Sequence, residues 1–510
     1  MRPVKKRIIV DGVDFGQLFR FPMIFRAVTA SMQVPRLLIG LAMVIILLLG
    51  GRAWDAATDN TIAPGQLAGV GSTSVDPEST LREAIRLFVP QEDWPERAPE
   101  RWPDDATAWI APIERGYANA SRDWSTRLSA DEIAARELAY EQMMVDLRAA
   151  KRMGPYQASA AHISASLGTM TRGAFVLNVS QTVGGVRDLF INLPVNLWRA
   201  SPTFVIFYGL FFLIVCSVGG GALSRMSACQ NAQQERLRIR DALGFVRDSS
   251  NALVSAPLLP LITVAIAAAG LFGLGILMIA PGLNVIGSVL YGVALLLGCL
   301  LAFLLVGYAI GLPLLIPAVA CENCSAGDAM QRAYAYVIQR PVHLALYYAT
   351  ALVGLAVGFA VVSVFASLTL NLTASIYGAV AGSESPMSVV GGVGLFDLRT
   401  TGGVEQTGWT NVTAASVLGF WQRLIVLLVG AYVMSYLFSA STIAYLLVRR
   451  ASDGQDVDEI WQAGLTPGTM APQPVVSARP KLDVQDASDD AGDVDSDADA
   501  DAVTASESSE

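Results

Sequence analysis

Long apolar runs alternate with polar segments along the chain. From residue 249 to residue 321, 73 consecutive residues include no Asp, Glu, Lys, Arg or His. Such a stretch cannot form a surface that faces water. A helix of about 20 residues crosses the ~30 Å of bilayer hydrocarbon, and helices satisfy their own backbone groups there. The pattern predicts an all-α membrane protein with six transmembrane helices, at about 33–51, 203–221, 252–279, 285–313, 344–370 and 417–447.

The distribution of basic residues predicts a single orientation in the membrane. Arginines concentrate in the polar loops 223–250 and 318–343, which lie within a five-helix domain at 201–450, whereas the loop 371–416 contains only Arg399. Because Lys and Arg accumulate on the cytoplasmic side, both loops and both termini are expected there. Residues 1–32 then form a basic cytoplasmic N-terminus.

Residues 52–200 form the one large polar segment between two predicted spans. Ser129 and Glu132 have the spacing of a capping box, and apolar positions continue at helical spacing to about Lys151. Trp198 lies in an amphipathic stretch that leads into the next span. We expect a mostly helical extracytoplasmic insertion between the first and second transmembrane helices.

The acidity of the chain is concentrated at its C-terminal end. The formal net charge is −9, yet residues 481–510 alone hold nine Asp, two Glu and one Lys, a net charge of −10. The other 480 residues therefore sum to about +1. Because apolar residues are sparse in 451–510, we expect this segment to be a disordered acidic cytoplasmic tail.

The two arginine-containing loops share a local pattern. Residues 240–247 read RDALGFVR and residues 327–334 read GDAMQRAY. In each, Asp–Ala–apolar begins an amphipathic helix that leads into the next span, and an acidic residue suits the first turn of a helix. The repetition suggests two related span–loop–span units.

These loops also resemble a known group of proteins. The sequence GALSR at 221–225, ERL at 235–237 and DALGF at 241–245, together with DAMQRAYAYVIQRP at 328–341, resembles uncharacterised multi-span membrane proteins of planctomycete bacteria. The resemblance covers roughly 200–350 and the layout of the spans. It implies the bacterial cytoplasmic (inner) membrane and no established activity. The pair Cys321 and Cys324 departs from that family.

Aromatic and basic residues near the ends of spans are candidates for contact with lipid headgroups. Such residues anchor helices at the membrane interface. The candidate interface residues are Arg332, Tyr334, Tyr336, Arg340, Trp198 and Trp421. Cys321 and Cys324 form a C-x-x-C pair, but Glu322 between them disfavours the thiolate that redox or metal chemistry needs.

The sequence gives no sign of catalysis. It contains no P-loop, G-x-S-x-G, H-E-x-x-H or dinucleotide-binding motif. We therefore expect no enzyme activity, no cofactor and no metal, and no nucleic-acid partner. The favoured interpretation is a non-catalytic scaffold or accessory protein in contact with the bilayer, with any protein partners bound through 52–200 or the acidic tail. The alternative is a transporter or lipid-handling permease for a neutral or lipidic substrate.

Overall fold

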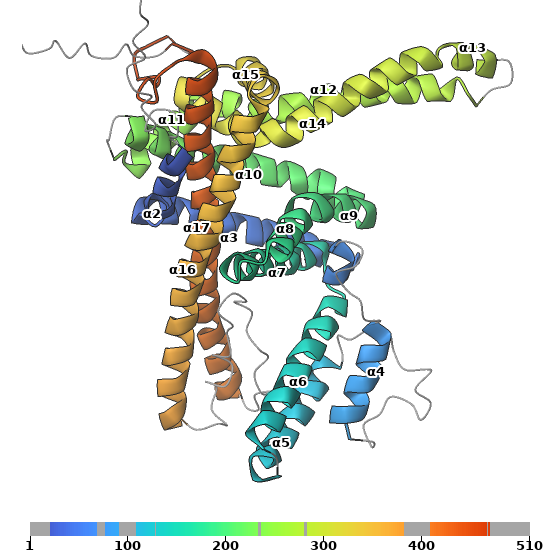
Figure 1. The fold of residues 1–510 in the computed structure, drawn as a ribbon, viewed down its shortest axis with the longest axis vertical. Coiled ribbons are helices and arrows are strands. Elements are labelled where there is room, and N and C mark those ends of the chain that lie inside the picture. Colours follow the sequence, from blue (N-terminus) through green and yellow to red (C-terminus); the bar gives the residue numbers. More distant parts are fainter. Residues whose placement is uncertain are drawn as a thin grey trace, which may run out of the picture. The chain divides into compact units, whose positions relative to one another are not determined.

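The computed structural model of the protein describes residues 21–68, 77–90, 109–127, 129–232, 236–279, 283–381, 409–466 and 468–469. It confirms the all-α fold: within these residues, six helices are long and apolar enough to cross a membrane (Figure 1). They are α3 (Val34–Ala57), α10 (Pro202–Ala232), α12 (Ser250–Ile276), α14 (Tyr291–Glu322), α16 (Pro341–Ala381) and α17 (Trp409–Asp453).

Several spanning helices extend beyond the apolar runs that predict them. Helix α10 continues to Ala232, so residues 223–232 are helix rather than loop. The reason is burial. Every residue from Gly219 to Cys229 is buried, so this stretch of small residues packs against protein instead of water. Helix α14 continues through Pro313 and Pro317, and the run predicted from 285 is divided into α13 (Leu283–Val289) and α14.

The two predicted amphipathic helices are present. They are α11 (Ile239–Asp248) and α15 (Ala326–Gln339), each with its Asp in the first turn. The Ser325 hydroxyl caps α15 by accepting a hydrogen bond from the Asp328 backbone N–H at 3.2 Å. Both helices bury alanines on one face, and that face packs into the large core shared with the spans.

The predicted insertion is helical. Its first part comprises α4 (Pro77–Phe88), α5 (Ile110–Arg127) and α6 (Ala130–Ala150), which enclose a small apolar core. The capping box is confirmed, because the Ser129 backbone N–H and hydroxyl both donate to Glu132 Oε2, at 3.0 and 2.9 Å. Which side of the membrane the insertion occupies stays a prediction.

The second part of the insertion packs on the spans. Asp55, near the end of α3, accepts hydrogen bonds from the backbone N–H groups of Tyr156 and Gln157, both at 3.0 Å. It thereby caps α7 (Pro155–Phe175), and Leu167 and Met170 of α7 belong to the large core. The rest of this part comprises α8 (Val179–Arg187), the π-helical η6 (Asp188–Asn192) and α9 (Leu193–Ala200); the 3-10 helices η1 (Phe21–Phe25) and η2 (Pro64–Leu67) and the short α2 (Arg26–Ala30) complete the fold.

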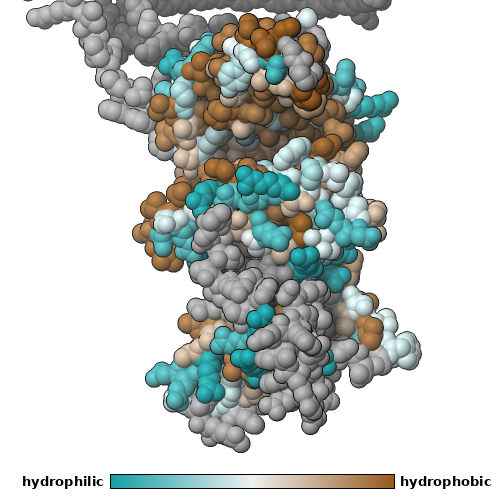
Figure 2. Space-filling model, turned by 90° about the vertical axis from the view of Figure 1, so that its right-hand side faces the viewer, coloured by the Kyte–Doolittle hydropathy of each residue, from teal (hydrophilic) through white to brown (hydrophobic). Residues whose placement is uncertain are grey.

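Glycines allow the spans to approach closely at particular points. A Cβ on Gly358 of α16 would lie 1.8 Å from the Tyr432 hydroxyl of α17, and one on Gly354 would lie 2.4 Å from the Tyr436 hydroxyl. By contrast, Gly273 and Gly275 of α12 face open space. The surface over the hairpin of α12 and α14 is largely apolar (Figure 2).

Candidate functional site: a buried charge network at one end of the spans

The last residue of α14, Glu322, is the centre of a buried charge network. Its side chain is completely buried, with Oε2 2.6 Å from Arg332 Nη1 and Oε1 3.5 Å from Arg449 Nη1. The Tyr445 hydroxyl donates a hydrogen bond to Oε1. One carboxylate is therefore shared by two guanidinium groups and a phenol, an arrangement that offsets the cost of removing it from water.

The chain beyond α17 folds back onto this network. The Trp461 backbone N–H donates to the Cys321 carbonyl at 2.8 Å, and the Gly468 N–H donates to the Glu322 carbonyl at 3.0 Å. These carbonyls belong to the last turn of α14, which has no helical partners for them. Arg449 donates to the carbonyls of Asp456, at 3.0 Å, and Glu459. We call residues 454–466 and 468–469 the docked segment.

Arg225 of α10 also binds the docked segment. Its Nη1 donates to the Ala320 carbonyl at 2.9 Å and its Nη2 to the Trp461 carbonyl at 2.8 Å. Its guanidinium carbon lies 4.9 Å from the Phe245 ring centre and 5.4 Å from that of Trp461. Cation–π contacts of this kind are stronger when desolvated, and Arg225 is buried.

The prediction of disorder from residue 451 onward is wrong for the first part of that segment. Asp453 is the last residue of α17, and Val457 and Ile460 are buried in the large core. The composition averaged over 451–510 does not reveal a short stretch near its start. The apolar side chains of this stretch are buried against the helices, and its backbone groups form hydrogen bonds with them. The acidic tail itself, 481–510, lies outside the described residues.

The structure brings two predicted interface residues into the network and places a third beside α14. Arg332 pairs with Glu322, and Tyr336, 1% exposed, donates from its hydroxyl to Asp453 at 2.5 Å. Tyr334 donates to the Leu304 carbonyl at 2.8 Å. Tyr336 therefore faces protein and not headgroups. Arg340, Trp198 and Trp421 are exposed, and their contact with headgroups stays a prediction.

Burial and neighbouring side chains shift the pKa values of two side chains of α15, Arg332 and Tyr336. Burial is the largest single effect on the pKa of Arg332 and lowers it, but the Glu322 carboxylate and the neighbouring Tyr445, Tyr336 and Cys324 together outweigh burial and raise the pKa, so the guanidinium stays charged. Burial, with the hydrogen bond to Asp453, raises the pKa of Tyr336 and keeps the phenol neutral. The contacts of these two side chains serve to hold α15 against α14 and α17.

The C-x-x-C pair has no activated thiol. Burial and then the Glu322 charge raise the pKa of the Cys324 thiol to about 12, so thiolate is scarce at neutral pH. Cys321 is also buried. Within the described ranges, no group of three or more His, Cys, Asp or Glu residues is placed to bind a metal ion.

Sequence reasoning missed the central residues of this site. Glu322 follows 73 residues without a charge, and Arg225 interrupts a run of small residues. Ionisable residues adjoining an apolar span are costly and therefore informative. That signal marks both positions, whereas Arg449 and Trp461 become recognisable as partners only when the docked segment is seen.

The fold and its apolar helices define a multi-span α-helical integral membrane protein. Comparisons of the chain with protein-family models, with curated proteins and with solved structures gave no match. The resemblance to planctomycete membrane proteins therefore stays a prediction.

Proposed function

We propose that the protein is a non-catalytic scaffold or accessory component of the bacterial cytoplasmic membrane, which presents its acidic tail to a basic partner in the cytoplasm. The observation that supports this proposal is the docked segment. Because residues 454–466 and 468–469 are bound to α10, α14 and α17, the chain is held against these helices as far as Gly468, shortly before the tail begins.

The placement of the buried charges also favours a scaffold over a carrier. Glu322 and Arg449 are fully buried and bind each other, neighbouring side chains and backbone carbonyls. Charges that serve transport are expected to line a path for substrate. Here they hold helices and the docked segment in place, which is a structural use.

A pull-down in mild detergent tests the proposal. The tagged full-length chain is compared with a chain that ends at residue 471, which keeps the docked segment and lacks the tail. A third chain has the full length and carries five substitutions: Asp493→Asn, Asp495→Asn, Asp497→Asn, Asp499→Asn and Asp501→Asn. A stoichiometric partner is expected with the full chain and is lost from the other two, because the attraction is electrostatic.

Two results would contradict the scaffold. One is a partner that binds all three chains equally, which removes the tail from the interaction. The other is the absence of any partner together with flux of a neutral solute through vesicles that contain the purified protein. The second result would establish the transporter or permease alternative instead.

A further inference from the structure

A second arginine cluster lies apart from the Glu322 network. Arg36, the third residue of α3, is 1% exposed. It donates from Nη1 to the Ser439 hydroxyl at 3.0 Å, and from Nη2 to the Met226 carbonyl at 3.2 Å and to Gln230 Oε1 at 2.6 Å. All three acceptors are uncharged, so no carboxylate among the described residues neutralises this buried guanidinium.

Arg36 also has unused donors. A guanidinium offers five N–H groups, and three are occupied here. The Nε atom is buried without a hydrogen-bond partner. A buried charge without a counter-charge is costly, and a buried donor without an acceptor adds to that cost. Both features point to an anionic acceptor at this position.

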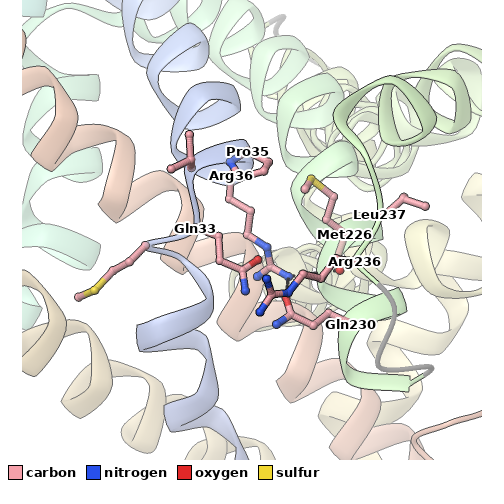
Figure 3. Close-up of a pocket in the computed structure, with 9 residues that line it drawn as sticks. Gln33, Pro35, Arg36, Met226, Gln230, Arg236 and Leu237 are labelled. Atoms are coloured by element: carbon pink, nitrogen blue, oxygen red, sulfur yellow. Dashed lines mark hydrogen bonds between the residues drawn. The ribbon is translucent and has the colours of Figure 1, made fainter.

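Arg36 lines a cavity of about 370 Å³. Figure 3 shows the Arg36 and Arg236 side chains approaching each other from α3 and from the chain that follows α10, with Gln230 beside them. Gln33 provides a second amide, and Met226 and Leu237 provide apolar walls. Among the described residues, the lining contains two cations, two amides and no carboxylate.

Two like charges at one cavity repel each other, and an anion bound between them offsets this repulsion. We propose that this cavity is a binding site for a phosphate oxyanion. Arginine is suited to the task because its planar N–H groups bind phosphate oxygens in pairs. The start of α3 adds the positive end of a helix dipole. Free phosphate and the headgroup of an anionic phospholipid share this chemistry, and the position at the end of two spans is accessible to either source.

Titrations of the purified full-length protein in detergent test the site. The midpoint of thermal unfolding is followed as inorganic phosphate is added in one arm and phosphatidylglycerol in the other, with zwitterionic phosphatidylcholine as the reference lipid. Binding to the folded state raises the midpoint with ligand concentration. The arm that saturates identifies the source of the phosphate.

The matched variants are Arg236→Gln and Arg238→Gln. Both residues are exposed in the same connection, but only Arg236 lines the cavity. Arg236→Gln is expected to raise the half-saturating concentration at least about tenfold, and Arg238→Gln to change it less than about twofold. Arg36→Lys, which keeps the charge but loses the paired N–H geometry, is expected to weaken binding as well.

Three results would overturn the proposal. The first is an unchanged midpoint in both arms, and the second is equal weakening by Arg236→Gln and Arg238→Gln, which indicates general charge attraction. The third is equal stabilisation by phosphatidylglycerol and phosphatidylcholine without an effect of inorganic phosphate, which indicates an apolar contact with lipid chains.

Discussion

The two ends of α14 have similar apolar sequences and different surroundings. Every residue from Leu314 to Glu322 is buried, whereas Tyr291 is 60% exposed, Leu296 74% and Val306 58%. Hydropathy identifies the whole helix as a span but does not distinguish the two ends. The difference lies in what covers them: at the Glu322 end, α10, α15, α17 and the docked segment pack around the helix, whereas the other end pairs with α12.

The comparison shows that hydrophobicity and tertiary packing are separate properties of a membrane helix. Lipid chains are as apolar as leucine, so an exposed leucine loses little in a bilayer, and helix association there depends on close packing and polar contacts. Other elements make polar contacts with α14 from Leu304 to Glu322. These contacts include the Glu322 ion pairs and the hydrogen bonds from Tyr334 and Tyr348 to the carbonyls of Leu304 and Ile310.

The largest effect is expected from removing the shared carboxylate. Glu322→Ala removes the carboxylate that Arg332 and the fully buried Arg449 share, and a broken buried pair costs about 3–5 kcal/mol. The measurement is the thermal unfolding midpoint of the full chain in detergent. Asp458→Asn, an exposed acid in the docked segment, is the control. Equal midpoints for the two variants would show that the network contributes no stability.

A second comparison uses one substitution at the two ends of α14. Leu314→Ala removes a fully buried side chain and is expected to cost about 2–5 kcal/mol. Leu296→Ala, at a position 74% exposed, is expected to change stability by less than about 0.5 kcal/mol. Unfolding in detergent measures both. A large loss with Leu296→Ala would show that a protein surface covers the exposed end of α14.

The smallest effect is expected from a methyl group at the helix contacts. Gly358→Ala forces the buried Tyr432 away from α16 and is expected to cost about 1–3 kcal/mol through overpacking. Gly273→Ala meets open space and, with the better helix propensity of alanine, is expected to be neutral or stabilising. The same unfolding assay applies. Destabilisation by Gly273→Ala and not by Gly358→Ala would reverse the assignment of tight and open contacts.

The sequence predicts the elements of this protein better than their contacts. Six apolar helices, the capping box at Ser129 and the two amphipathic helices follow from spacing, because periodicity and capping are local properties. Helix ends were less accurate: nothing local indicates that residues 223–232 are surrounded by protein and remain helical.

The candidate site depends on partners that are distant in sequence, which a local pattern does not reveal. Arg225 and Trp461 are 236 residues apart, and Arg36 and Ser439 are 403 residues apart. The sequence predicts Arg332 and Tyr336 as membrane-interface residues, whereas in the structure both bind protein groups, Glu322 and Asp453. The residue types indicated an interface, and only the packing shows which kind.

Contacts between residues that are far apart in the sequence determine the order in which the molecule is assembled. Arg36 leaves the ribosome 403 residues before Ser439, an interval of roughly 20–80 s at 5–20 residues per second. Arg225 and Glu322 must likewise wait for Trp461 and Gly468. The spans that carry these residues are therefore synthesised well before the residues that complete their contacts. A chain that stops before the docked segment keeps the ion pairs of Glu322 but lacks the hydrogen bonds that Trp461 and Gly468 make with α10 and α14.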